Sequence, residues 1–165
     1  MDPNMDPNED GQEVKPRFFI DERWFETANR SFRAMAQARM CDSCKEKLGT
    51  ETQERAPSID PHTGRVVFEI RTVPFGQSPT SVIRSCCSKR RDYITPETPV
   101  VEALFRVFLA SGNQPMDAER LREELSNYVS MSDRPHNYSA ELIERIIKKD
   151  RYYGLQRFNV ASDLD

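Results

Sequence analysis

Four cysteines are the residues of this chain whose type and spacing can do chemistry: Cys41, Cys44, Cys86 and Cys87. The first two form a CxxC pair, which turns two thiolates toward one point. The second two are adjacent, so the backbone must bend for both to reach a common partner. Four converging thiolates are the donor set of a tetrahedral zinc ion, with Zn–S distances of about 2.3 Å. The spacing therefore predicts a metal site with zinc as its cofactor.

The same cysteines allow other interpretations, which the sequence leaves open. An iron–sulfur cluster uses the same thiolate ligands, so the sequence does not separate it from zinc. A CxxC pair is also typical of redox dithiols, but these lie in alternating strand–helix domains, and no such alternation is visible here. All four cysteines could instead be ordinary reduced thiols. His62 is a candidate ligand in place of one cysteine, although its neighbours indicate an exposed turn.

The composition is that of a small protein with a modest core. The chain has 165 residues, 37 % of them hydrophobic and 31 % charged, which allows one domain or two small ones. Small domains often need a metal to supplement the core, in agreement with the cysteines. No run approaches the roughly 20 apolar residues of a membrane span, and the acidic N-terminus does not fit a secretory signal. We therefore expect a cytoplasmic protein, in which thiols stay reduced.

Charge is unevenly distributed along the chain. The net charge of −3 does not favour nucleic-acid binding by the whole molecule, but residues 16–95 are basic and both ends are acidic. We divide the chain into a disordered acidic tail (1–15), a Cys-rich metal-binding α+β unit (16–94), a second unit (95–158) and a short tail (159–165). The first tail repeats the tetrapeptide Met-Asp-Pro-Asn and contains nothing that fills a core.

One helix is expected to lead into the CxxC pair. Asp21 has the side chain of a helix cap, and apolar residues recur beyond it at three- and four-residue steps. These residues are Trp24, Ala28, Phe32 and Met35. Packing of this face would position the first cysteine pair.

The second cysteine pair follows a loop, a strand and a short helix. Residues 50–64 are polar and predict a loop, and residues 65–73 are rich in β-branched side chains and predict a strand. Ser78 and Pro79 then form the start of a helix that delivers the adjacent cysteines.

Residues 95–158 predict three helices followed by an aromatic strand. Pro99 begins the first helix, Asp117 caps the second and Ser139 caps the third. Residues 152–158 are expected to form a short strand or a hairpin. This order is the pattern of a winged helix-turn-helix, so we expect an α+β protein with a mainly α second unit.

Part of the second unit resembles the HARE-HTH domains, which include the N-terminal domain of the RNA polymerase delta subunit. The resemblance spans residues 97–158 and rests on three runs: Glu102-Ala103-Leu104-Phe105, Asn113-Gln114-Pro115-Met116-Asp117 with Leu121, and Asp150-Arg151-Tyr152-Tyr153-Gly154-Leu155. It implies a winged helix and a role linked to transcription or chromatin. That family has no catalytic residues to carry over, and the cysteine unit lies outside it, with only a zinc-ribbon-like CxxC site.

Candidate contacts to nucleic acid or to a protein partner are basic residues beside the cysteines and on the third helix. They are Lys89, Arg90, Arg91, Arg145, Lys148, Lys149 and Arg151. Counterion release favours Lys and Arg on DNA, whereas Glu141 and Glu144 disfavour insertion of this helix into a groove. Binding to DNA, to a protein such as RNA polymerase, or to both therefore stays open.

No catalytic motif is visible in the sequence. It contains no phosphate-cradling glycine loop, no HExxH and no GxSxG, and four sulfur ligands would leave a metal no open position for a substrate. The sequence predicts a non-enzymatic, zinc-stapled regulator or adaptor that docks on the transcription machinery or DNA through a winged helix. An iron–sulfur redox-responsive regulator and a structural accessory subunit of a larger complex are the alternatives.

Overall fold

The computed structural model describes residues 15–129 and 138–159. Short helices and strands share the chain, which confirms the predicted α+β class. In chain order the elements are β1 (Arg17–Ile20), α1 (Glu22–Thr27), α2 (Phe32–Gln37), α3 (Asp42–Glu46), β2 (Glu51–Ile59), β3 (Val66–Pro74), α4 (Pro79–Ser85), the 3-10 helix η1 (Cys87–Lys89), α5 (Val100–Ala110), β4 (Met116–Asp117), α6 (Ala118–Tyr128), α7 (Ala140–Lys149) and β5 (Leu155–Arg157).

Two predicted segments fall almost wholly outside these ranges. The tails at residues 1–15 and 159–165 lie outside the described residues except at Lys15 and Asn159. Among the helices that the structure does describe, none has both the length and the apolar character needed to cross a membrane.

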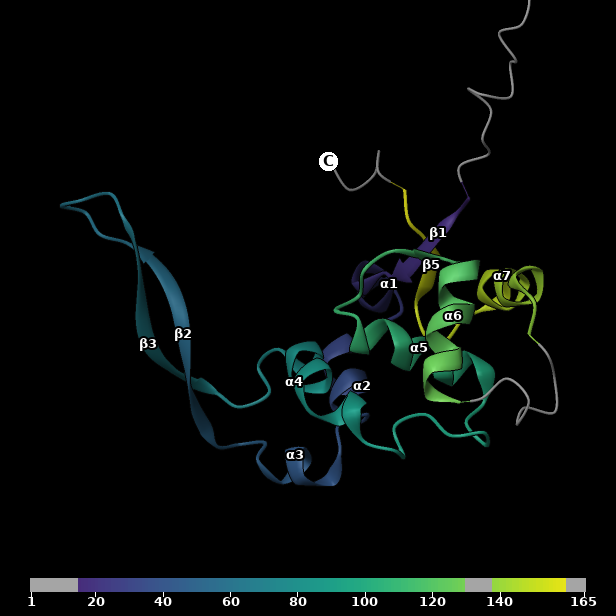
Figure 1. Cartoon of the computed structure of the whole chain (residues 1–165), viewed down its shortest axis with the longest axis horizontal. Coiled ribbons are helices and arrows are strands. Elements are labelled where there is room, and N and C mark those ends of the chain that lie inside the picture. The colour runs from purple at the N-terminus through teal and green to yellow at the C-terminus, as the bar shows by residue number, and fades with distance from the viewer. Residues whose placement is uncertain (1–14, 130–137, 160–165) are drawn as a thin grey trace, which may run out of the picture.

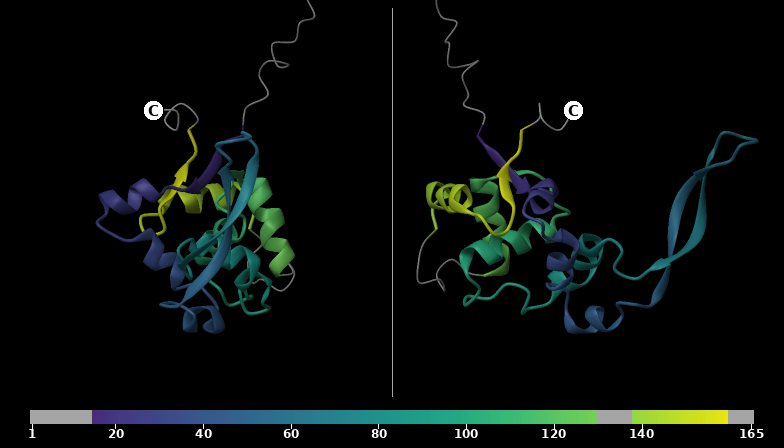
Figure 2. Two further views of the ribbon diagram at one scale, coloured as in Figure 1. Left: turned by 90° about the vertical axis from the view of Figure 1, so that its left-hand side faces the viewer. Right: turned by 180° about the vertical axis from the view of Figure 1, so that it is seen from behind.

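The molecule has two parts of very different shape (Figure 1). Strands β2 and β3 form a long hairpin, residues 51–74, which we call the arm. The other described residues form the body, where the helices gather around a small sheet. The right-hand view of Figure 2 shows from behind that the arm stands away from the helices.

The sheet of the body has three antiparallel strands in the order β4-β1-β5. Phe18, in the central strand, pairs with Met116 on one side and with Arg157 on the other. Helices α5, α6 and α7 pack on one another in sequence, α5 packs on β1 and α7 packs on β5. Their shared core is apolar and almost fully buried, and its largest members include Phe18, Phe25, Phe105, Phe108, Leu121, Leu125 and Ile143.

The central strand comes from the predicted first unit, while both of its partners come from the second. The side chain of Asn113 extends this connection, because its Oδ1 accepts from the Ile20 N–H and its Nδ2 donates to the Ile20 carbonyl, both at 2.8 Å. Residues on both sides of the predicted boundary at residue 94 therefore share one sheet and one core.

Helix boundaries from α5 to α7 follow the signals in the sequence. The Asp117 carboxylate accepts from the Arg120 N–H at 2.8 Å and caps α6, and the Ser139 hydroxyl accepts from the Leu142 N–H at 3.2 Å and caps α7. Helix α5 follows Pro99 and ends just before a turn with positive φ at residues 112–113. The predicted strand after α7 is confirmed as β5.

The single helix predicted before the CxxC pair is wrong, because the structure has two. Helix α1 ends at Thr27, and Asn29 adopts φ 55°, a left-handed conformation that asparagine tolerates better than most residues. Ser31 then caps α2. The break rotates the apolar face, so that Phe25 is buried while Ala28 is exposed.

The loop predicted at residues 50–64 is also wrong over most of its length. Residues 51–59 form β2, which pairs antiparallel with β3 from Glu51 opposite Pro74 to Ile59 opposite Val66. The segment looked like a loop because most of its side chains are polar and almost all are exposed. The extended conformation of β2 is stabilised by its backbone pairing with β3 and not by burial of a side-chain face.

Candidate metal centre

The four cysteines converge at one place in the body. Their sulfur atoms all lie within 4.8 Å of one another, so this cluster can hold a metal ion. Cys44 and Cys87 are buried and the other two are half-buried. All four are free, without a disulfide.

Helix α3 presents the first pair. Cys41 is the residue before the helix, and its carbonyl accepts from the Cys44 N–H at 3.0 Å and from the Lys45 N–H at 2.9 Å. This single turn brings the Cys41 and Cys44 side chains to the same side of the chain, as the CxxC spacing predicts.

A sharp bend presents the second pair. Cys86 is the residue just after α4, and its backbone angles of φ −130° and ψ −67° belong to neither helix nor strand. Cys87 then begins η1. The bend satisfies the condition that two adjacent cysteines impose, because it directs both side chains to one point.

Hydrogen bonds join the two pairs directly. The Cys41 N–H donates to Cys87 Sγ at 3.2 Å, and the Sγ atoms of these two residues are 3.5 Å apart. The Ser43 hydroxyl lies 3.3 Å from Cys41 Sγ and accepts from the Arg90 guanidinium at 2.8 Å. Backbone and side-chain contacts between the two cysteine segments therefore hold the cluster in place.

Electrostatics make this cluster a natural site for a cation. Burial acts to raise the pKa of the Cys41 thiol, but hydrogen bonds from Ser43 and from the Cys44 backbone outweigh it and lower that pKa to about 6. Burial and the neighbouring thiols raise the pKa of Cys44 to about 12, and burial also raises the pKa of Cys87. Several thiolates this close together would repel one another. A bound divalent cation offsets this repulsion and so stabilises the deprotonated cysteines that coordinate it.

The cluster also forms the base of the arm. One cysteine pair precedes β2 and the other follows β3, so an ion bound there joins the two ends of the arm. Gly76, at φ 78°, is packed so closely that a Cβ would come within 2.7 Å of the Leu48 side chain. The Phe75 N–H donates to the Thr50 carbonyl at 2.8 Å. The two ends of the arm are therefore already in contact with each other.

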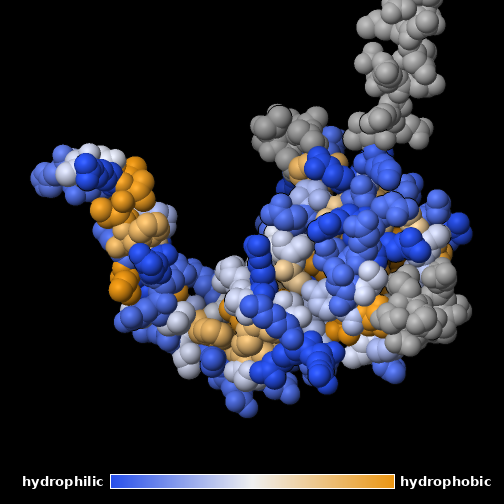
Figure 3. All heavy atoms as spheres, in the orientation of Figure 1, coloured by the Kyte–Doolittle hydropathy of each residue, from blue (hydrophilic) through white to orange (hydrophobic). Residues whose placement is uncertain are grey.

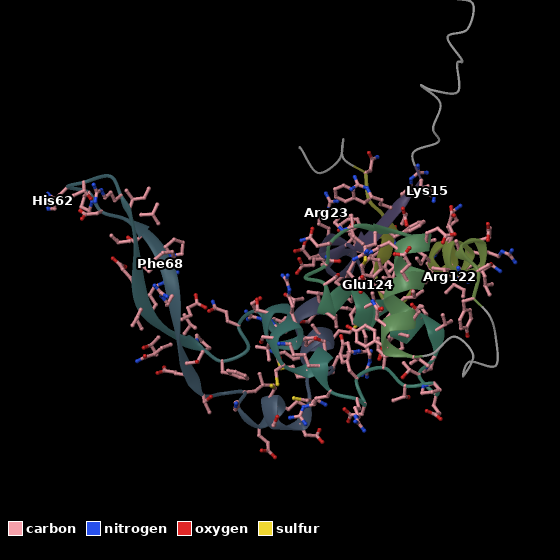
Figure 4. All side chains as sticks on the ribbon, in the orientation of Figure 1. Lys15, Arg23, His62, Phe68, Arg122 and Glu124 are labelled. Carbon is pink, nitrogen blue, oxygen red and sulfur yellow. The ribbon has the colours of Figure 1, made fainter. Side chains whose placement is uncertain are left out.

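His62 does not lie near this cluster. It occupies the turn at the far tip of the arm, where its N–H donates to the Asp60 carboxylate at 2.8 Å (Figure 4). The possibility that His62 replaces a cysteine ligand is therefore wrong for this structure.

The predicted contact cations form two groups. Lys89, Arg90 and Arg91 follow the second cysteine pair, next to α4, while the others lie on or just after α7, on the opposite side of the body (Figure 1). In the second group, Lys148 pairs with Glu144 at 3.2 Å, and Arg151 donates to the carbonyls of Lys148 and Asp150. The structure therefore does not gather the seven cations on one surface.

Sequence reasoning missed the part that Ser43 and Arg90 play at the cysteines. Ser43 could have been noticed as a hydroxyl between two ligands. Nothing in the sequence indicates that Arg90 reaches it, because their contact depends on how α3 and η1 pack.

Comparison of the chain with protein-family models, with curated proteins and with solved structures finds no match. The candidate metal centre thus rests on the geometry of its four cysteines.

Proposed function

We propose that this chain is a non-enzymatic adaptor whose body is stapled by one zinc ion and docks on the transcription machinery, on DNA or on both. The convergence of four cysteine sulfurs within 4.8 Å carries the proposal. We also propose that the protein works in the cytoplasm, where such thiols stay reduced for metal binding.

The spacing of the sulfur atoms favours a single ion over a cluster. Tetrahedral zinc with Zn–S bonds of about 2.3 Å separates its sulfur ligands by about 3.8 Å. Here the Cys41 and Cys87 sulfur atoms are 3.5 Å apart, and all four lie within 4.8 Å of one another. An iron–sulfur cluster places further irons and bridging sulfides between the cysteines and needs a wider cage. With four sulfur ligands the ion would have no open position, so its role would be structural rather than catalytic.

The order of elements in the body supports a winged helix. Helix α5, strand β4, helices α6 and α7 and strand β5 follow one another as in that fold. In place of a third strand at the end of the chain, β1 pairs between β4 and β5. The resemblance of residues 97–158 to HARE-HTH domains agrees with this assignment and motivates the link to transcription.

Helix α7 offers a docking surface better suited to a protein than to a DNA groove. Arg145, Lys148 and Lys149 are exposed on it, but Glu141 is exposed as well and Glu144 pairs with Lys148. Acidic side chains on the same helix oppose deep entry into DNA. Phosphate contacts near the end of α7 remain compatible with the proposal.

Metal analysis of anaerobically purified protein tests the staple. We expect about one zinc per chain and no visible absorption, and loss of the zinc in Cys44→Ser. Ser43→Ala is the matched control, because it changes the same turn but removes no ligand. Iron with a broad visible band would support the redox-responsive alternative, and protein without metal would overturn both.

Docking is tested separately with purified components. Arg145→Glu with Lys149→Glu should weaken binding to RNA polymerase or to duplex DNA, while Arg65→Glu in the arm should not. For DNA, affinity should fall steeply between low and moderate salt. Absence of binding to either component would overturn the docking role and leave the metal centre untouched.

A further inference from the structure

The arm has one apolar face that nothing in the described structure covers. Ile59, Val66, Phe68 and Ile70 are 70 %, 64 %, 60 % and 69 % exposed, respectively. With Pro57 they form what we call the apolar face of the arm. Figure 3 shows orange residues along the arm, and Figure 4 shows Phe68 on it, away from the body.

The strand register explains why these side chains share a face. Side chains alternate between the two faces of a strand, and paired residues lie on the same face. Three consecutive same-face pairs are Arg55 with Ile70, Pro57 with Phe68 and Ile59 with Val66. The intervening pairs on the other face are mostly polar and include Glu54 with Arg71, Ala56 with Glu69 and Ser58 with Val67. The arm is therefore amphipathic without a core of its own.

The apolar face of such a two-stranded hairpin is expected to pack on another surface. A two-stranded hairpin alone is marginally stable in water, and it becomes stable when its apolar face packs on something. The four exposed side chains present on the order of 500 Å², near the upper end of the roughly 300–600 Å² that is usual for the largest patch of a monomer. Such patches commonly mark interaction sites.

The chain outside the described ranges offers no suitable cover. Residues 1–14, 130–137 and 160–165 are predominantly polar, and the longest of them carries five acidic residues. It joins the body at Lys15, on the side opposite the arm (Figure 4). None of these segments therefore supplies an apolar surface that matches the apolar face of the arm.

The charge of the arm disfavours a nucleic acid as that molecule. Residues 51–74 carry Glu51, Glu54, Asp60 and Glu69 against Arg55, Arg65 and Arg71. Nucleic-acid binding requires an excess of basic residues, which is missing here. The near balance of charges also means that two arms would not repel each other strongly.

We propose that the apolar face of the arm binds the same face of a second copy of this chain, in a two-fold symmetric dimer. The face is symmetric about its central pair, Pro57 and Phe68. With the two-fold axis there, the Ile59–Val66 pair of one copy lies against Ile70 and the aliphatic stem of Arg55 in the other. A two-fold interface requires this kind of self-complementary surface.

The area is sufficient for a specific contact. Two such faces together remove on the order of 1,000 Å² from water, about the lower limit for a biological interface. In the dimer, Phe68 of each copy would lie at the centre, where aromatic side chains contribute most to binding. Arg55, whose guanidinium lies 4.9 Å from the Phe68 ring centroid, would form part of the rim.

Analytical ultracentrifugation of the purified full-length chain over a range of concentrations tests the dimer. We expect the native chain to dimerise at micromolar concentrations, and Phe68→Glu to raise the dissociation constant at least about 100-fold, because it buries an unpaired charge. Val67→Glu is the matched control, since it adds the same charge to the next residue on the opposite face. Both variants should keep the native circular dichroism spectrum and metal content.

Photocrosslinking places the contact. The photoreactive amino acid p-benzoylphenylalanine at position 68 should give covalent dimers, and the same residue at position 67 should give few. A native chain that stays monomeric up to about 100 µM would overturn the proposal and leave the face to a different protein. A native dimer that Phe68→Glu does not weaken would overturn it as well. Neither result bears on metal binding or on docking through α7.

Discussion

Two phenylalanines show how differently the two parts of this molecule are built. Phe108 in α5 is fully buried in the body, among side chains from β1 and the helices. Phe68 in β3 is 60 % exposed, with the Arg55 guanidinium 4.9 Å from the centre of its ring. The body is ordered by the burial of apolar surface, whereas the arm is ordered by its backbone ladder and by its anchored base.

The cysteine cluster lies where these two regimes meet. On one side it adjoins the core, to which Cys44 and Cys87 contribute. On the other side it adjoins both ends of the arm. A metal there would couple a part that is stable through packing to a part that has no core.

Removal of one ligand should have the largest effect and should separate the surroundings of the cysteine cluster from the sheet of the body. A structural zinc site supplies about 10–16 kcal/mol of apparent binding free energy in small domains, so we expect Cys44→Ser to lower the free energy of unfolding by more than about 5 kcal/mol. Hydrogen exchange should accelerate at residues 40–50 and 75–90 before it does so in β1. Uniform loss of protection throughout the chain would mean that body and cluster fold as one unit.

A large-to-small substitution in the core of the body should come next. Phe108→Ala removes a fully buried ring, and such changes cost about 3–5 kcal/mol because they leave a cavity. Urea denaturation followed by circular dichroism measures the loss. A cost below about 1 kcal/mol would show that the body is loosely packed, contrary to the burial described here.

Loss of a buried carboxylate should have an intermediate effect. Asp150 is 8 % exposed and accepts from the backbone N–H groups of Tyr152, Tyr153 and Leu155 at 3.0–3.1 Å. Asp150→Ala leaves these donors without their acceptor and should cost about 2–3 kcal/mol in urea denaturation. The same substitution at the exposed Asp92 should change stability by less than about 0.5 kcal/mol.

The smallest effect is expected for the substitution that matches Phe108→Ala in the arm. Phe68→Ala should change the free energy of unfolding of the monomer by less than about 0.5 kcal/mol, because the ring is mostly exposed. Denaturation at several protein concentrations, extrapolated to infinite dilution, removes any contribution from dimerisation. A cost comparable to that of Phe108→Ala would mean that the arm packs on its own body.

Much of the body could be predicted from the sequence because its signals are local. Asp117 and Ser139 cap the helices that their spacing indicates, and the apolar stripe of α5 faces the core. The convergence of the four cysteines was also predictable, since ligand spacing of this kind has few other uses. The helix caps are contained in short runs of sequence, whereas the cysteine cluster follows from the chemistry that its two distant pairs share.

The incorrect predictions concern features that depend on contacts between distant residues or on the conformation of a single residue. Residues 51–59 form a strand only because β3 lies beside them, and no periodicity within the segment shows this. The placement of β1 between β4 and β5 requires knowledge of where residues 116 and 155 lie in space. The break between α1 and α2 turns on the left-handed conformation of Asn29, which an apolar pattern at helical spacing conceals.

An ion bound by Cys44 and Cys86 would close the chain between them into a loop. The ion would hold the two ends of this loop together even if residues were inserted within it. The entropy of closing a loop grows slowly, by about 0.6 kcal/mol for each doubling of its length. The turn at residues 60–64 is therefore a suitable position for inserting a peptide, a fluorophore or a foreign recognition sequence. The graft would be displayed well away from the helices, and the hydrophobic core would be left unchanged.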